Sequence, residues 1–247
     1  MENPSFIAIS HLAGLRRQLD VIANNVANAA TAGYQGERMS FETMVSRKAR
    51  SPGVDGAGQA ASFVVDKGLW RDYRPGPVER TGNTFDVALI GPGYIAVQTE
   101  EGERYTRAGA FRTDAQGRLA LGNGALLLGD GGQPITVPPG ETQFEIDRRG
   151  VITGKDGVVG RIRVVRFDDE QALRRTGNML LETESEPRPV DRRTEVAQGM
   201  IEKSNVQSVS EITQMIELTR RYQSASRMID QEHERARRAI DKLSRVG

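Results

Sequence analysis

Residues 12–34 read LAGLRRQLDVIANNVANAATAGY. Apolar side chains recur here at alternating steps of three and four, a period of about 3.5 residues that is typical of a helix burying a narrow stripe against another helix. A core helix of a globular domain would show the same period, so both interpretations stay open. Pro4 suits the first turn of such a helix, and Asn3 suits its cap. The stripe consists of Leu12, Leu15, Leu19, Ile22, Val26 and Ala29.

Three asparagines, Asn24, Asn25 and Asn28, lie near the end of this stretch. Asparagine is a mediocre helix former because its amide competes for nearby backbone groups. Asn25 flanks the stripe, where an asparagine can fix the register of packed helices at a cost in stability. Asn28 and Gly33 are expected to end the helix, since Gly33 can adopt a positive φ. We therefore interpret the stretch as an assembly and stop signal.

A second stripe with the same spacing lies at the other end of the chain. It predicts a helix over about residues 194–245, roughly 75 Å long at 1.5 Å per residue. A pattern of this length indicates a coiled coil, although polar members of the stripe would make an isolated homodimer weak. The obvious partner is the N-terminal stripe, in the same or in neighbouring subunits. The members are Ile212, Met215, Thr219, Tyr222, Ser226, Ile229, His233, Ala236, Ile240 and Leu243.

The middle of the chain carries turn signals rich in glycine, proline and aspartate between short β-type runs, which is typical of an all-β barrel or sandwich. The sequence therefore predicts an α+β fold. Long N- and C-terminal helices would form a coiled-coil-like tube segment, with a central all-β domain looped out between them. The predicted domains are an N-terminal axial helix and turn (1–45), a linker or extended loop (46–62), a β-rich outer domain (63–190) and a C-terminal axial helix (191–247).

The sequence shows no constellation of catalytic, cofactor-binding or metal-binding residues. The chain has no cysteine, which removes thiolate catalysis and zinc–thiolate sites. Its two histidines, His11 and His233, lie on expected helices without a metal-ligand motif, so we interpret them as surface or seam residues. Residues 150–156 (GVITGKD) are too short for a phosphate loop, and Asp156 would repel phosphate. We expect no enzyme activity, no cofactor and no metal.

The charge balance bears on nucleic-acid binding. A net charge of +1 gives no long-range attraction to nucleic acid. An arginine-rich helical nucleic-acid-binding protein is the alternative from another functional class, with Arg235, Arg237 and Arg238 as its basic face. The acidic neighbours Glu232 and Glu234 dilute that face, so we expect no nucleic-acid partner.

The first residues do not form a signal-peptide pattern. Glu2 is the only charge ahead of the apolar run, and His11 interrupts that run. No stretch approaches the roughly 18 apolar residues of a membrane span. We expect no direct membrane insertion, and export, if it occurs, without a cleaved leader.

Four ordered motifs give the chain a family resemblance. Together they resemble the signatures of the bacterial flagellar rod and hook proteins, and they cover nearly the whole length. Two departures are the absence of the common asparagine before Thr31 and the presence of Phe85 in place of leucine. The motifs are LDVIANNVAN with TAGY (19–28, 31–34), FDVALIGPGY (85–94), YTRAGAF with DAQGRL (105–111, 114–119), and QGMIEKSNV with ITQMI and RYQ (198–206, 212–216, 221–223).

The resemblance implies an axial structural subunit of the flagellar basal-body rod that spans the periplasm and passes torque. It implies other rod proteins and copies of itself as partners, and passage through the flagellar type III export apparatus. It also implies terminal helices inside and a β domain outside. The chain length leaves a proximal or a distal rod subunit, and the stretch LGDGGQPITVPPG (128–140) favours the proximal type.

The stripes and signatures together predict an assembly interface. Because both stripes lack a partner before assembly, we expect the monomer to be only partly ordered. The predicted interface residues are Leu12, Leu15, Leu19, Ile22, Asn24, Asn25, Val26, Asn28, Gly33, Tyr34, Asn205, Val206, Ile212, Met215, Ile216, Tyr222 and Ile229.

Overall fold

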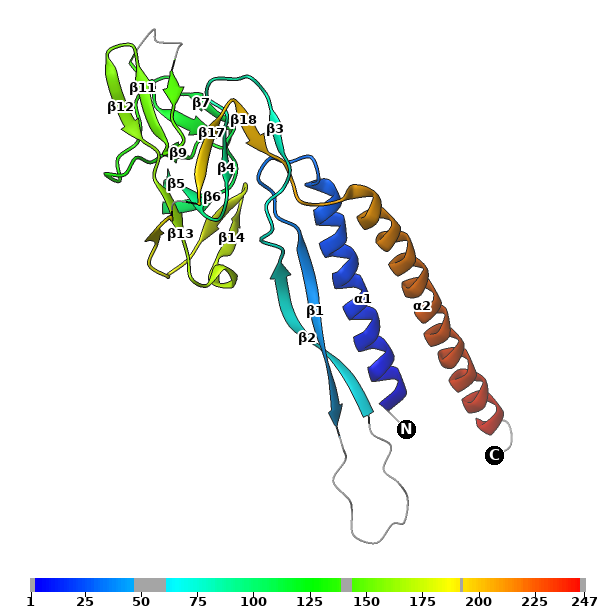
Figure 1. Cartoon of the computed structure of the whole chain (residues 1–247). Helices are drawn as coiled ribbons and strands as arrows, with labels where there is room; N and C mark the ends of the chain where they lie inside the picture. Colours follow the sequence, from blue (N-terminus) through cyan, green and yellow to red (C-terminus); the bar gives the residue numbers. More distant parts are fainter. Residues whose placement is uncertain (1–2, 47–60, 139–143, 192, 245–247) are drawn as a thin grey trace. The chain divides into compact units, whose positions relative to one another are not determined.

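The computed structural model describes residues 3–46, 61–138, 144–191 and 193–244 (Figure 1). The chain divides into two compact units, each built from segments distant in sequence. Unit 1 combines residues 1–27, 37–70 and 207–247. Unit 2 combines residues 28–36 and 71–206.

Unit 1 contains two helices and a two-stranded sheet. Helix α1 (Asn3–Ala27) packs against both α2 (Ser208–Ser244) and β1 (Glu37–Ser46), and β1 pairs with β2 (Ala61–Arg71). Neither described helix is long and apolar enough to cross a membrane. The helix pair is held by a small apolar cluster of buried Leu15, Ile22 and Leu218, with Leu19, Val26, Met215, Tyr222 and Ala225 packed around them.

The predicted fold class is wrong in its helical part. The described residues contain two α-helices and no coiled-coil-like tube segment, because α1 packs on a strand as well as on α2. Polar and apolar residues alternate over residues 38–42 of β1 (RMSFE), a short run that favours a strand. The central β-rich region is present. Most of the predicted linker, residues 47–60, lies outside the described residues.

Helix α2 begins at Ser208, well after the expected start near residue 194. Two short strands precede it: β17 (Glu195–Gln198) and β18 (Met200–Glu202). Gly199 separates them with a φ of +69°, which a helix cannot contain. Strand β17 pairs with β4 (Val87–Ile90), and β18 pairs with β3 (Val78–Arg80). These residues complete the β-rich unit, so they are unavailable to the helix.

The largest sheet of unit 2 has nine strands, in the order β14-β15-β6-β5-β9-β8-β7, with β13 pairing both β5 and β16. A separate antiparallel sheet has the order β10-β11-β12. A 3₁₀ turn, η1 (Glu170–Ala172), precedes β14. The remaining strands are β5 (Tyr94–Thr99), β6 (Gly102–Thr106), β7 (Phe111–Thr113), β8 (Leu119–Leu121), β9 (Leu126–Leu127), β10 (Glu145–Ile146), β11 (Val151–Gly154), β12 (Gly157–Arg161), β13 (Val164–Arg166), β14 (Arg174–Gly177), β15 (Leu180–Glu182) and β16 (Arg188–Pro189).

Two apolar clusters form the core of unit 2. The larger one includes aliphatic side chains of β4, β5, β8 and β9, together with residues of later strands and loops, and Phe85 packs against it. The ring of Phe85 lies 5.7 Å from that of Phe144, so the core accommodates the larger side chain. The smaller cluster is aromatic: the rings of Tyr105 and Phe167 meet edge to face at 4.8 Å. Burial raises the pKa of Tyr105 to about 12.

Aspartate side chains organise two turns of unit 2. The Asp147 carboxylate accepts hydrogen bonds from the backbone N–H groups of Arg149, at 2.8 Å, and Val151, at 2.9 Å. Gly150, with a φ of +79°, closes that turn. The Asp114 turn has the same arrangement, with Gln116 and Arg118 as donors. These contacts, led by the one from Val151, hold the pKa of Asp147 below its usual value.

Candidate assembly site

A buried ion pair lies in unit 2. The Arg107 guanidinium meets the Glu202 carboxylate at 2.7 Å, and the two side chains are 5% and 1% exposed. Arg107 also donates to the carbonyl oxygens of Gly91, at 2.9 Å, and Gly93, at 2.7 Å. The second Glu202 oxygen accepts from the backbone N–H of Gly76 at 3.0 Å. Both charges are thus matched by polar partners, which is the condition for tolerating them in a core.

The turn that contains Gly33 docks directly on this ion pair. The backbone N–H of Gly33 donates to the Glu202 carbonyl at 2.8 Å. Gly33 has a φ of +70°, and a Cβ built on it would lie 2.4 Å from the backbone nitrogen of Ala108. The backbone at Gly33 therefore packs directly against the backbone of Arg107 and Ala108, and only glycine fits at this position. The turn begins at Asn28, whose carbonyl accepts from the N–H of Thr31 at 3.0 Å.

Tyr34 and Asn205 extend the same cluster. Tyr34 is 1% exposed, and the Arg175 guanidinium lies 4.4 Å from its ring centre, a cation–π arrangement. The Asn205 amide accepts from the N–H of Gly36 and donates to the carbonyls of Asp72 and Arg74, each at 2.8 Å. We name the set Gly33, Tyr34, Gly76, Arg107, Glu202 and Asn205 the signature cluster, because it joins residues from three of the four sequence motifs.

Asn25 makes the corresponding polar contacts in unit 1. It is 2% exposed, and its side chain both accepts from the N–H of Glu37, at 3.0 Å, and donates to the carbonyl of Glu37, at 2.8 Å. It also donates to the buried carboxylate of Glu211 at 3.2 Å. One amide thereby connects α1, β1 and α2 within the chain, so Asn25 is a contact between elements of one subunit.

The structure brings some predicted interface residues together and leaves others apart. Leu15, Leu19, Ile22, Val26, Met215 and Tyr222 pack in the helix pair. Leu12, Ile229, Asn28 and Val206 are half-buried, and Asn24 is exposed. Ile212 and Ile216 are 45% and 50% exposed. Together with Val209, which is 81% exposed, they form what we name the outer face of α2.

The sequence interpretation missed Leu218, Glu211, Arg107 and Glu202. Leu218 is buried in the helix pair, whereas the predicted C-terminal stripe contains Thr219 instead. Replacing Thr219 by Leu218 gives the steps Glu211, Met215, Leu218, Tyr222 and Ala225, a regular four-three alternation. That phase would also have placed Ile212 and Ile216 outside the buried stripe, roughly 100° and 140° around the helix from its centre.

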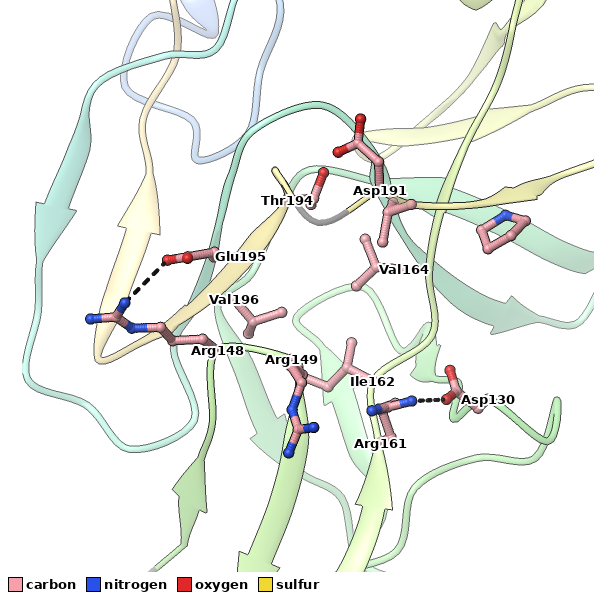
Figure 2. A pocket seen from close by; sticks show the side chains of 12 residues that line it. Asp130, Arg148, Arg149, Arg161, Ile162, Val164, Asp191, Thr194, Glu195 and Val196 are labelled. Atoms are coloured by element: carbon pink, nitrogen blue, oxygen red, sulfur yellow. Dashed lines mark hydrogen bonds and ion pairs between the residues drawn. The ribbon is translucent and has the colours of Figure 1, made fainter.

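A groove of about 490 Å³ opens on the surface of unit 2 (Figure 2). Its apolar lining comes from Ile162, Val164, Val190 and Val196, and from Pro189. Three arginines and three acidic residues surround that lining: Arg148, Arg149, Arg161, Asp130, Asp191 and Glu195.

The charges around the groove are loosely paired. The Arg148 guanidinium lies 3.9 Å from the Glu195 carboxylate, and the Arg161 guanidinium lies 3.4 Å from the Asp130 carboxylate. Figure 2 marks both pairs with dashed lines. The hydrogen bond from the Arg193 side chain holds the pKa of Asp191 below its usual value. Within the described ranges no three His, Cys, Asp or Glu residues gather as a metal site. An apolar floor with a rim of both charges suits contact with protein.

Family models of known proteins match three separate stretches of the chain. Three family models match the chain: "Flagella basal body rod protein" over residues 7–35, "Flagellar hook protein FlgE/F/G D1 domain" over 88–154 and "Flagellar basal body rod FlgEFG protein C-terminal" over 197–242. The signature cluster thus draws residues from all three matched regions or their immediate borders.

Curated relatives match along the full chain. The flagellar basal-body rod protein FlgF of Caulobacter vibrioides is 39% identical over 256 residues, covering 100% of both chains. FlgF of Mesorhizobium japonicum is 33% identical, with 98% of each chain covered. FlgG of Bacillus subtilis is 31% identical, with 91% of this chain and 92% of the relative covered. The chain therefore belongs to the flagellar basal-body rod proteins, most like FlgF, and is a structural subunit of the rod.

Proposed function

We propose that this chain is a proximal rod subunit that assembles with copies of itself and with other rod proteins, and passes torque across the periplasm. The match to FlgF over the complete length of both chains carries the proposal, at 39% identity against 31% for FlgG. A distal rod subunit is the second candidate, which the FlgG matches favour. In either role the subunit is structural and performs no catalysis.

The outer face of α2 supports the assembly part of the proposal. Exposed apolar side chains on one side of a helix cost free energy in water and mark surfaces for protein contact. We propose that Ile212 and Ile216 contact neighbouring subunits. Met215 and Tyr222, which were also predicted as interface residues, pack inside the helix pair. They contribute to assembly indirectly, because this packing fixes which side of α2 is exposed.

Two charge-introducing substitutions on α2 test this role. Ile216→Asp places a charge on the outer face, and we expect loss of motility and of rod incorporation. Gln214→Asp places the same charge on an exposed position of the same helix, away from that face, and we expect normal motility. Circular dichroism of both purified variants checks that the helix is retained. Normal motility and incorporation in Ile216→Asp would exclude this contact.

We further propose that the subunit reaches the rod through the flagellar type III export apparatus, without removal of a leader. This part rests on the resemblance to the rod proteins and is tested in cells. Secretion should stop when the export apparatus is disabled. The protein isolated from rods should retain the N-terminal residues of the chain. Continued secretion through the general secretory pathway would contradict it.

The small helix-pair core supports partial order before assembly. Among the described side chains of the helix pair, only Leu15, Ile22 and Leu218 are buried apolar residues, with five others partly buried around them, whereas packing usually supplies most helix stability. We propose that unit 1 gains order on assembly. Circular dichroism of the monomer at micromolar concentration measures this, and helix content equal to that of α1 plus α2 would contradict it.

A further inference from the structure

The turn between β14 and β15 has an unusual sequence for its backbone conformation. Gly177 pairs with Leu180, so Asn178 and Met179 form a two-residue hairpin loop. Their φ angles are +48° and +64°, and in the part of the chain that the structure describes they are the two non-glycine residues with positive φ. Positive φ at both central residues is the pattern of a type I′ turn, which strongly favours Asn-Gly. Methionine therefore occupies a position where the backbone alone would select glycine.

A second hairpin of unit 2 has the expected residue. In the turn between β8 and β9, Gly124 follows Asn123 and has a φ of +88°. A Cβ built on Gly124 would meet nothing within 4 Å. The chain thus has glycine at a left-handed position in open space, so the methionine at position 179 needs a separate physical reason.

Two hydrogen bonds hold the strained turn in place. The Thr106 hydroxyl donates to the Met179 carbonyl at 2.8 Å, and the Asn123 side-chain amide donates to the Asn178 carbonyl at 3.0 Å. Thr106 is completely buried and directly precedes Arg107 of the signature cluster. Left-handed non-glycine residues persist only where the surrounding structure enforces them, and they occur preferentially at functional positions. The anchoring of this turn next to Arg107 therefore indicates where its function lies.

Met179 lines a small cavity beside the buried ion pair. The cavity has a volume of about 10 Å³, which is room for about one water molecule. Arg107, whose guanidinium meets the Glu202 carboxylate at 2.7 Å, lines the same cavity, as does Gly33. The methionine side chain and the cation of the ion pair thus border one enclosed space.

Exposure within the turn shows which way the methionine is directed. Met179 is half-buried, whereas Gly177 and Asn178 in the same turn are exposed. From this arrangement we infer that the strained turn places the Met179 side chain over the cavity, where it keeps water away from the Arg107–Glu202 ion pair. Water would raise the local dielectric constant and weaken the attraction that offsets the desolvation of the two charges. Met179 is thus a positioning residue of the signature cluster, and this role does not depend on the position of the subunit in the rod.

Hydrogen exchange at the Arg107 side chain tests the inference, because its Nε–H donates to Glu202 at 2.8 Å. Isotope-labelled arginine makes the exchange of this N–H with water measurable by NMR in the full chain. Met179→Ala removes most of the side chain, and Met179→Leu is the matched control, since both variants keep a non-glycine residue in the left-handed region. We expect exchange at least about tenfold faster in Met179→Ala and nearly unchanged exchange in Met179→Leu. Unchanged exchange in Met179→Ala would overturn the inference.

The dependence of this exchange on urea separates water entry from a general loss of stability. Exchange through a local opening is nearly independent of low urea concentrations, whereas exchange through global unfolding rises with urea because much more surface is exposed. We expect the faster exchange of Met179→Ala to be independent of urea. If it rose as steeply as global unfolding, Met179 would be a stabilising contact only, and the inference would be overturned.

Glycine substitutions in the turn give a second test, which depends on the sign of the change. If the turn conformation alone mattered, Met179→Gly would raise the midpoint of thermal unfolding, because glycine adopts a positive φ without strain. We expect this variant to lower the midpoint instead, since the cavity loses its cover. Asn178→Gly, at the exposed position of the same turn, is the control and should not lower the midpoint. A Met179→Gly chain as stable as the natural chain would overturn the assignment of Met179.

Discussion

Arg107 and Glu202 form a salt bridge of 2.7 Å whose members are separated by 95 positions in sequence. Their side chains are almost fully buried, and each makes further hydrogen bonds to backbone groups of other segments. The bridge therefore connects the YTRAGAF motif to the C-terminal EKSNV motif. Loss of this salt bridge should lower the free energy of unfolding of unit 2 as a whole.

Glu202→Gln should destabilise unit 2 by about 3–5 kcal/mol, because it leaves the Arg107 charge buried without its counter-ion. Urea unfolding of the full chain, followed by near-ultraviolet circular dichroism of the core tyrosines, measures the change. Arg148→Ala is the control, since its pair with Glu195 is exposed and worth about 0–1 kcal/mol. Equal costs for the two variants would contradict the importance of the buried bridge.

Gly33→Ala should destabilise the chain more than Gly82→Ala. The two glycines have nearly the same φ, +70° and +74°, so both substitutions carry the cost of a left-handed alanine, about 1–2 kcal/mol. Only at Gly33 would the new Cβ also meet backbone atoms, whereas nothing lies within 4 Å at Gly82. Thermal unfolding of both variants isolates the steric part. A Gly33→Ala variant as stable as Gly82→Ala would show that the turn moves away freely.

Asn25→Ala should lower the helix content of the chain, because it removes hydrogen bonds that join α1, β1 and α2. Leaving such buried polar groups unmatched costs about 1–3 kcal/mol. Circular dichroism over a temperature series gives the loss, and Asn24→Ala, at the exposed neighbouring position, is the control. Unchanged helix content in Asn25→Ala would contradict the role of this amide.

The Asp147 turn should make the free energy of unfolding decrease as the pH falls into the acid range. Its pKa is lower in the folded chain than the usual value of about 3.9, so the folded state binds fewer protons. The contribution of Asp147 is therefore complete above the unfolded pKa and is lost as the pH falls through the folded pKa. The difference in unfolding free energy between the natural chain and Asp147→Asn should shrink over that window. A difference independent of pH would contradict it.

Local chemistry made part of this structure predictable. The turns at Asp114 and Asp147 each carry an aspartate that caps its own backbone and a glycine that takes a positive φ, and both features are visible in four residues. The positive φ of Gly33 was expected for the same reason. The end of α1 at Ala27 agrees with the stop signal around Asn28.

Other features depend on contacts that the sequence does not display. No local signal pairs Arg107 with Glu202, since they lie 95 positions apart in the sequence and meet only in the folded unit 2. Only residues 38–42 of β1 alternate between polar and apolar, and this short signal was outweighed by the helical stripes, which favoured a coiled coil. On α2, the helical periodicity was identified correctly. The predicted stripe passed through Thr219, whereas Leu218 is the buried residue, so the predicted buried face lies partly to one side of the observed one.

In the proposed rod role, the signature cluster would determine how mechanical load enters unit 2. The chain passes between the two units near residues 28–36, 71–76 and 202–206, and hydrogen bonds join these three segments to one another. A pull on any one of these three segments is thus shared by the other two before it reaches a sheet. The strands would then be loaded together in shear, whereas a separate attachment at each crossing would let a strand peel away one hydrogen bond at a time.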